Sequence, residues 1–328
     1  MSVCFVGAVV LIRLLTTVDA ESIKSVEDGR IRHLRYETDI AMPCKRIMKI
    51  ADKYEARITF LLPIGEVSAD NKAVFDLARE MGKRHDIQVH LHRPFPLMSD
   101  DEIVELIRTE IELIEDVVGC RPNCIRAGGY NVGEGRKWVN CVSRAGLQMD
   151  CSVWSGANVY TTRSIVDSAL PREEERWGRG ALRFDFRNAP LAGAYTPSTE
   201  NIAEVGDSPV VEIPISMRGY SEIDPWKYRL DPQTQQLDEM KETLLAYLKR
   251  ADETRDFVLE MIWHTNNNFL ILKPFGVVYG RRSVRNFEYF LRYVAMKHTG
   301  RDVEFATASE LDLSKISKEP VMPPGSFY

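Results

Sequence analysis

Short apolar runs alternate with longer amphipathic segments along nearly the whole chain, and this alternation constrains the fold more than any other feature. Since strands that alternate with helices form parallel sheets covered by those helices, the sequence predicts an α/β fold. The predicted strands cover residues 9–18, 57–62, 86–92, 123–127, 209–213 and 256–263. The predicted helices cover 70–83, 133–145, 232–252 and 283–298, with two more beginning at Pro43 and after Ser99.

Two of the helix boundaries carry chemical signals. Pro43 suits the first position of a helix, because the backbone N–H that proline lacks would have no helical partner there. Ser99 and Glu102 have the spacing of a capping box, and an apolar stripe at helical spacing continues from Ile103. The sequence therefore predicts a helix that begins after Ser99 and ends at Gly119.

Composition allows one large domain and argues against some partners. The chain has 328 residues, with 44% hydrophobic and 28% charged, which is enough to bury a sizeable core. Its net charge is −5 and no basic segment stands out, so we expect no nucleic-acid partner. We expect one catalytic domain over residues 1–320, with an irregular, loop-rich insertion at about 155–208, followed by a tail at 321–328.

Localisation is predicted from the cysteines and the first residues. The six cysteines form no CxxC pair, and a chain of this length does not need disulfides, so we expect reduced thiols and a cytoplasmic protein. The apolar run from Val3 to Leu15 imitates a signal peptide, but Arg13 interrupts it and Asp19 lies at the would-be cleavage site. The run is also too short to span a bilayer. We expect a buried strand; export is the alternative if residues 1–20 act as a signal peptide.

Side chains that can bind metal follow two of the predicted strands. In parallel sheets, functional side chains gather at the carboxyl ends of the strands. His90 and His92 are two apart, so they point the same way, and Asp19 and Glu21 alternate likewise after the first strand. A carboxylate with two imidazoles forms a three-ligand set that leaves room for water and substrate on a metal. The alternatives are histidines facing water and acids that merely begin a polar loop.

Two further strand ends carry candidates for acid–base chemistry. Arg126, which precedes Gly128 and Gly129, could hold a carboxylate in its ionised form, although a simple Gly-Gly turn is the alternative. His264 ends a late apolar strand, where it is either a general acid or a structural histidine.

Six segments, taken in order, resemble the motifs of the polysaccharide deacetylases with the NodB-homology fold, also grouped as carbohydrate esterase family four. They are residues 17–21, 54–60, 85–92, 124–130, 150–154 and 262–264, so the resemblance spans about 15–310. The family's commoner pattern has adjacent aspartates, histidines four apart and a proline after the third-motif arginine. Here both pairs are two apart, and Gly128-Gly129 follows instead. The resemblance implies a distorted (β/α) barrel of mostly parallel strands.

The resemblance also implies an activity. A hydrolase of this kind removes an N-acyl group, above all N-acetyl, from a sugar or glycan. Glu21, His90 and His92 would bind a divalent ion, zinc in the first place, which lowers the pKa of a bound water. Asp19, oriented by Arg126, would take the proton of that water.

The remaining roles follow from the same resemblance. His264 would protonate the departing amine, a backbone N–H near Tyr130 would help to hold the oxyanion, and Trp154 would line the groove. The expected substrate is an N-acetylated sugar, free, in an oligosaccharide, or linked to a nucleotide or lipid. Three alternatives stay open: Glu37 and Asp39 as the acidic motif, a catalytically inactive carbohydrate-binding protein, and a hydrolase of small non-sugar amides.

Overall fold

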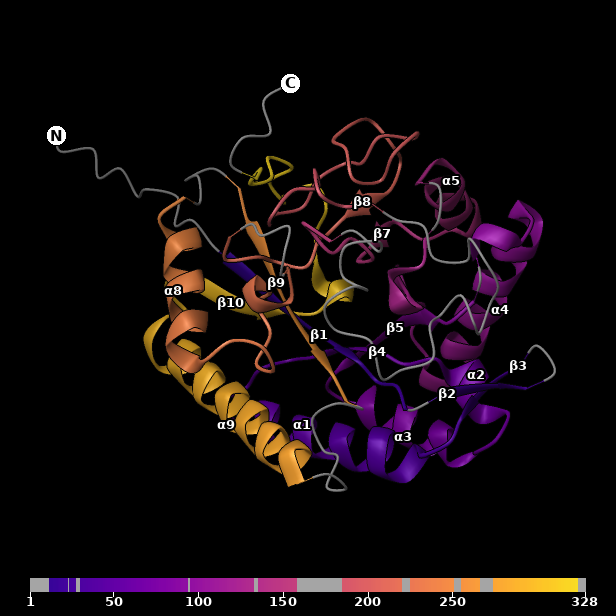
Figure 1. Cartoon of the computed structure of the whole chain (residues 1–328), viewed down its shortest axis with the longest axis horizontal. Helices are drawn as coiled ribbons and strands as arrows, with labels where there is room; N and C mark the ends of the chain where they lie inside the picture. Colours follow the sequence, from indigo (N-terminus) through magenta and orange to yellow (C-terminus); the bar gives the residue numbers. More distant parts are fainter. Residues whose placement is uncertain are drawn as a thin grey trace, which may run out of the picture.

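Eight strands form one curled parallel sheet, and helices pack around its outside (Figure 1). The strand order is β10-β1-β4-β5-β6-β7-β8, and β9 pairs with β1. The strands are β1 (Ile12–Asp19), β4 (Thr59–Leu61), β5 (Asp86–Leu91), β6 (Cys124–Ala127), β7 (Met149–Asp150), β8 (Val211–Glu212), β9 (Phe257–His264) and β10 (Val303–Ala306). The α/β fold with a curled, mostly parallel sheet is as predicted.

Helices connect these strands. They are α1 (Met42–Lys53), α2 (Ile64–Ser68), α3 (Ala73–Met81), α4 (Asp100–Val118), α5 (Gly135–Ala145), α8 (Leu237–Leu248) and α9 (Pro274–Lys297). An antiparallel hairpin of β2 (Lys24–Glu27) and β3 (Arg30–His33) and a π-helical turn η1 (Tyr36–Ala41) precede α1. Single 3-10 turns include η3 (Gly128–Tyr130), directly after β6.

The computed structural model describes residues 12–22, 24–27, 30–93, 95–132, 135–157, 185–219, 225–250, 255–265 and 274–323. Half of the predicted loop-rich insertion, at 158–184, lies outside the described residues, as do residues 1–11, which include most of the apolar amino-terminal run. Among the helices that are described, none is long and apolar enough to cross a membrane.

β1 pairs with three other strands, and its carboxyl end supplies the acids of the site. It pairs along its whole length with β9, and on its other side with β10 at its start and β4 at its end. Every residue of β1 except Arg13 is buried, as expected for a parallel strand that is covered on both faces. The register places Asp19 opposite both Leu61 and His264, so the ends of three strands meet at one level.

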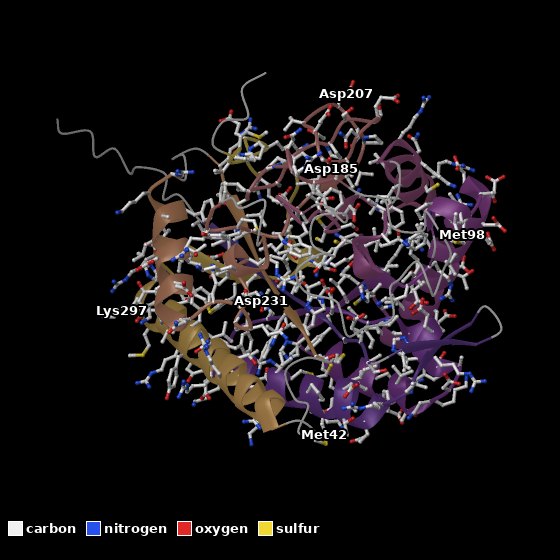
Figure 2. The ribbon with its side chains drawn as sticks, in the orientation of Figure 1. Met42, Met98, Asp185, Asp207, Asp231 and Lys297 are labelled. Atoms are coloured by element: carbon white, nitrogen blue, oxygen red, sulfur yellow. The ribbon has the colours of Figure 1, made fainter. Side chains whose placement is uncertain are left out.

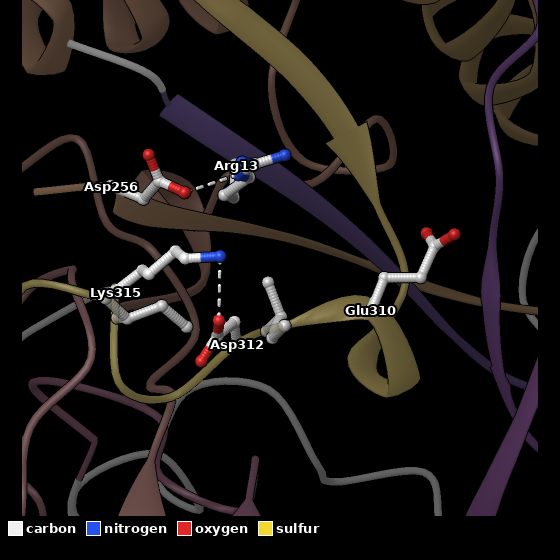
Figure 3. Close-up of a pocket in the computed structure, with 7 residues that line it drawn as sticks. Arg13, Asp256, Glu310, Asp312 and Lys315 are labelled. Carbon is white, nitrogen blue, oxygen red and sulfur yellow. Dashed lines mark hydrogen bonds and ion pairs between the residues drawn. The ribbon is translucent and has the colours of Figure 1, made fainter. Parts of the chain in front are cut away.

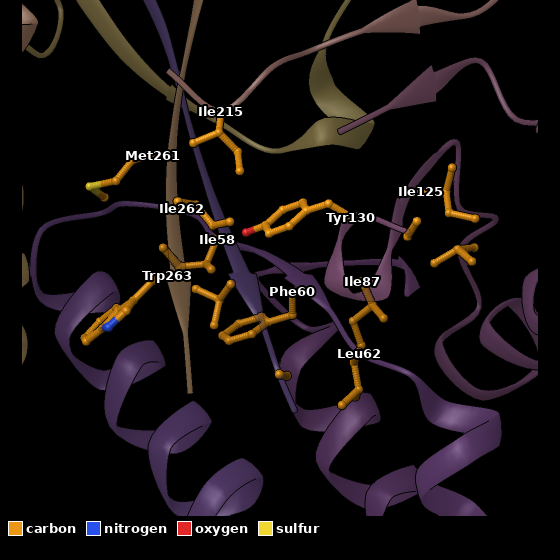
Figure 4. Close-up of a cluster of buried hydrophobic side chains, with 14 of the residues drawn as sticks. Ile58, Phe60, Leu62, Ile87, Ile125, Tyr130, Ile215, Met261, Ile262 and Trp263 are labelled. Atoms are coloured by element: carbon orange, nitrogen blue, oxygen red, sulfur yellow. The ribbon is translucent and has the colours of Figure 1, made fainter. Parts of the chain in front are cut away.

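The core fills the space between the strands and the helices. Figure 4 shows Phe60 and Ile87 from neighbouring strands, with Ile262 and Trp263 from β9, all of them buried. Irregular chain bridges β8 and β9: Leu230 N donates to Ser216 O at 2.7 Å, and Ile262 N donates to Leu230 O at 3.0 Å. The curled sheet is thus continued by single hydrogen bonds where no regular strand runs.

Helix α4 confirms the predicted boundaries. Ser99 and Glu102 form the capping box, and Gly119 ends the helix with a left-handed φ of 80°. The apolar stripe of the helix is buried against its neighbours. Two helix starts differ from the prediction. Helix α9 begins at Pro274 instead of 283, and α8 begins at Leu237 instead of 232, because Gln236 and Glu239 form its capping box.

A small cleft of about 120 Å³ lies at the opposite, amino-terminal end of β1 (Figure 3). Its charged walls are paired: Arg13 Nε lies 2.7 Å from Asp256 Oδ2, and Lys315 Nζ lies 3.0 Å from Asp312 Oδ2. The first pair ties β1 to the residue before β9, and backbone hydrogen bonds of Asp256 with Lys315 and Ser317 tie that residue to the carboxyl-terminal segment. Pairing of this kind at the amino end of a barrel is typical of a stabilising role.

Candidate metal and catalytic site

Three buried side chains that were predicted to bind metal meet at the carboxyl ends of β1 and β5. His92 Nε2 lies 2.5 Å from Glu21 Oε2, and His90 Nε2 lies 4.0 Å from the same oxygen. The two histidines share one side of β5 because they are two residues apart. Their ligand-capable atoms and that of Glu21 all lie within 4.8 Å of one another, so the cluster could hold a metal ion.

In each ring, the hydrogen bond made by Nδ1 determines which nitrogen is available to an ion. His90 Nδ1 lies 2.9 Å from Arg126 O, and His92 Nδ1 lies 3.0 Å from Glu66 Oε2. Since both oxygens only accept, each Nδ1 carries a proton, and only Nε2 is left to offer a lone pair to an ion. His90 Nε2 is buried and has no hydrogen-bond partner within the described part of the chain. A buried, unpartnered imidazole nitrogen beside a carboxylate fits a divalent cation.

Gly128 allows the His92 ring to lie where it does. A Cβ atom placed on Gly128 would lie 2.1 Å from His92 Cδ2, closer than any real contact. Only glycine can bring the backbone after β6 so near to the ring. The Gly-Gly pair is therefore more than a turn, because it makes room for a predicted ligand.

Glu66, from α2, was not among the predicted site residues. It accepts hydrogen bonds from the backbone N and Nδ1 of His92 and from Arg93, and it faces His33 Nε2. Burial alone would raise the pKa of Glu66, but the hydrogen bonds from His33 and His92 hold it well below its ordinary value. Glu66 follows β4 by five residues, so the rule that functional side chains lie at strand ends could have found it.

Asp19 and His264 form the second half of the site. Asp19 Oδ2 lies 3.3 Å from His264 Nε2, while Oδ1 accepts from Arg126 Nη1 at 2.6 Å. Burial alone would raise the pKa of Asp19, but Arg126, His264 and His90 outweigh it and lower it. Burial lowers the pKa of His264, against the opposing charges of Asp19 and Glu21. Asp19 is thus ionised at neutral pH, with a histidine in contact.

Arg126 is held from several sides. Its Nε donates to Cys151 O at 2.7 Å, Nη1 donates to Thr17 Oγ1 at 3.1 Å, and Nη2 forms an ion pair with Glu260. Arg126 and Glu260 are fully buried. Glu260 was not predicted, because it is a single acid inside the apolar run of β9. The guanidinium therefore joins two buried carboxylates, those of Asp19 and Glu260.

Replacing Arg126 with methionine is expected to lower the free energy of unfolding by about 3–5 kcal/mol, because two carboxylates would be left buried without a counter-charge. Urea unfolding at neutral pH measures the change. Arg144→Met is the matched control, since Arg144 pairs with Asp101 on the exposed surface and should have little effect. Equal midpoints for the two variants would contradict the structural role assigned to Arg126.

Tyr130 and Trp154 form a buried aromatic pair on the other side of the site. Tyr130, labelled in Figure 4, has a left-handed φ of 57°. Its ring centroid lies 5.5 Å from that of Trp154. Arg229 stacks over Trp154 at 5.0 Å and lies 2.5 Å from Asp231, which Figure 2 places toward the centre of the view. Trp154 was predicted to line the groove. In the structure it packs against Tyr130 and Arg229 and is 3% exposed.

The alternative acidic motif lies elsewhere. Glu37 and Asp39 belong to η1, where Asp39 accepts from Arg35 at 2.9 Å and Glu37 is exposed. Neither residue belongs to the metal-capable clusters found among the residues that the structure describes. The structure therefore brings Asp19 and Glu21, and not the alternative pair, to the histidines.

No protein-family model matches the chain, and no curated protein matches it in sequence. Solved structures do match over most of its length. A Mycobacterium smegmatis protein described as a polysaccharide deacetylase is 18% identical, with a TM-score of 0.51 over 92% of this chain and 88% of that chain.

Two further structures resemble the chain. A Parabacteroides distasonis protein described as a glycoside hydrolase/deacetylase is 12% identical, with a TM-score of 0.60 over 92% of this chain and 70% of that one. Puue allantoinase is 14% identical, with a TM-score of 0.53 over 93% of this chain and 89% of its own. Similarity at this level of identity establishes the fold. The chain has the NodB-type deacetylase fold that the six segments predicted.

Proposed function

We propose that this protein is a metal-dependent hydrolase that removes an N-acyl group, in the first place N-acetyl, from a carbohydrate. The observation that carries the proposal is the meeting of Glu21, His90 and His92 beside the Asp19–His264 pair, at the carboxyl ends of the strands. The shared fold supports it, because a protein described as a polysaccharide deacetylase and one described as a glycoside hydrolase/deacetylase have the same fold.

Glu21, His90 and His92 would hold the ion. One carboxylate and two imidazoles suit zinc and leave coordination positions for other ligands. When bound there, zinc would lower the pKa of a water molecule and polarise the acyl carbonyl.

Asp19 and His264 would move the protons. Asp19, kept ionised by Arg126 at 2.6 Å, would accept the proton of the attacking water at its carboxylate. Asp19 would pass this proton to the imidazole of His264, with which it is in contact, and His264 would donate it to the departing nitrogen, because an amide anion is too poor a leaving group to depart unprotonated. The Asp19 carboxylate, 3.3 Å from His264 Nε2, would stabilise the protonated ring. A backbone N–H near Tyr130 would donate to the developing oxyanion.

A second candidate function is hydrolysis of a small non-sugar amide. Puue allantoinase, which shares this fold, favours it. The same residues would carry out the same proton transfers, and only the groups around the substrate would differ.

One experiment tests both candidates. The purified protein is analysed for metal and assayed for acetate release from a panel of N-acetyl sugars, and for hydrolysis of allantoin and linear amides. We expect about one equivalent of zinc and acetate release that a chelator abolishes and added zinc restores. Hydrolysis of the small amides alone would favour the second function. A protein that binds sugars, but binds no metal and hydrolyses none of the substrates, would be the inactive carbohydrate-binding alternative.

A further inference from the structure

We propose that Glu66 is a positioning residue: it fixes the tautomer and orientation of His92 for metal binding and is not itself a ligand. This inference rests on the proposed function, since it concerns the ion that the proposed hydrolase needs. It also decides between two clusters that share His92, one with Glu21 and His90 and the other with His33 and Glu66.

The acceptor sites of Glu66 are all in use. Oε1 accepts from the backbone N of His92 at 2.8 Å and from Arg93 Nη1 at 2.8 Å. Oε2 faces His92 Nδ1 at 3.0 Å and His33 Nε2 at 3.4 Å. A carboxylate offers about four lone-pair sites, and four N–H groups point at them here. An ion could bind Glu66 only by displacing one of these donors.

His92 can serve only one of the two clusters at a time. Its Nδ1–H donates to Glu66, so only Nε2, which lies 2.5 Å from Glu21 Oε2, is left to offer a lone pair to an ion that Glu21 also binds. The cluster with His33 would need the lone pair on Nδ1, the opposite tautomer. Metal-binding histidines ordinarily donate their second N–H to a carboxylate or carbonyl, which is the arrangement of His92 with Glu66.

The surroundings make Glu66 a rigid support. It is buried on α2, and it binds both the backbone and the ring of His92, so the residue cannot rotate without losing two hydrogen bonds. Gly128 lies against the opposite side of the ring. Arg93 neutralises the carboxylate of Glu66, since its Nη1 lies 2.8 Å from Glu66 Oε1.

The test is Glu66→Gln, which keeps the size of the side chain but replaces one acceptor oxygen with a donor. We expect the affinity for Zn²⁺ to fall about 10- to 100-fold, with the stoichiometry unchanged at one. Competition with a chromophoric chelator on metal-free protein measures both values. The unfolding midpoint in urea shows whether the variant is folded.

Glu110→Gln is the matched control. Both carboxyl oxygens of Glu110, on α4, lie 3.1 Å from the backbone N of Gly65, which precedes Glu66 on α2. Among the described residues, no hydrogen bond or ion pair joins Glu110 to His92. Burial raises the pKa of Glu110 to about 8, so the group is largely neutral at pH 7 and glutamine conserves its charge. Its Zn²⁺ affinity should stay at the wild-type value.

His33→Gln separates the two clusters. If the inference holds, this variant keeps wild-type stoichiometry and nearly wild-type affinity, because His33 contacts Glu66 and not the ion. Loss of the ion from His33→Gln would place the ion in the other cluster and overturn the inference. If wild-type protein binds no ion, the proposed function itself fails; if wild type and Glu66→Gln bind equally tightly, only the positioning role fails.

A measurement on the unaltered protein covers the case in which Glu66→Gln does not fold. Long-range ¹H–¹⁵N correlation spectra of histidine side chains report which ring nitrogen carries the proton. We expect the Nδ1–H tautomer for His92 in the zinc-loaded protein. The Nε2–H tautomer would overturn the inference.

Discussion

Replacing His264 with alanine is expected to lower kcat for acetate release by about 10²- to 10⁴-fold while the zinc content stays at one equivalent. The reason is geometric: His264 lies 3.3 Å from Asp19 and is not one of the three side chains assigned to the ion. The kinetics are measured beside metal analysis of the same preparation. Because only the general acid is lost, KM should change much less than kcat.

His298→Ala is the control for this result. His298 pairs with Asp302 at 2.9 Å, just after α9, and belongs to neither cluster that could hold an ion. Its removal should leave kcat and zinc content unchanged. Loss of zinc from His264→Ala would show that His264 is a ligand, and an unchanged kcat would exclude it as the general acid.

Replacing His90 with alanine is expected to remove both the ion and the turnover. His90 Nε2 is a buried nitrogen, and without it the ion would keep only Glu21 and His92. Metal analysis should give well below one equivalent after dialysis, and acetate release should fall to the background rate. Excess zinc should restore at most a small part of the activity.

His85→Gln is the matched control for His90→Ala, because it changes another buried histidine near β5. His85 is buried at the start of β5, where its Nδ1 accepts from Ile58 N at 3.3 Å, so it has a structural partner and no place in the candidate metal clusters. This variant should keep its zinc. A His90→Ala protein that retained zinc and activity would show that the ligand assignment is wrong.

The site residues that the sequence predicts are those whose positions follow from local spacing along a strand or from the parallel sheet. A strand repeats every two residues, so His90 and His92 had to share a side, whatever the rest of the fold. The predicted parallel sheet then accounts for the meeting of Asp19 with His264, because parallel neighbours end at the same edge. Ser99 and Gly119 likewise predict both ends of α4, because each caps the helix through local contacts.

The residues that escaped prediction depend on partners far along the chain. Glu260 is a lone acid in an apolar strand, and only the fold shows that Arg126, 134 residues away, neutralises it. Glu66 lies in a helix of five residues, too short for a helical period to show. The packing of Trp154 likewise depends on a distant residue, since Arg229 stacks over its ring.

The contact between Gly128 and His92 links two departures from the usual deacetylase motifs. One is the closer spacing of the histidines, and the other is the lack of a proline after Arg126. Any side chain at position 128 would overlap the ring that the closer spacing brings there. Placing a proline at this position would therefore displace the ring of a proposed metal ligand, so in this chain the glycine and the closer histidine spacing depend on each other.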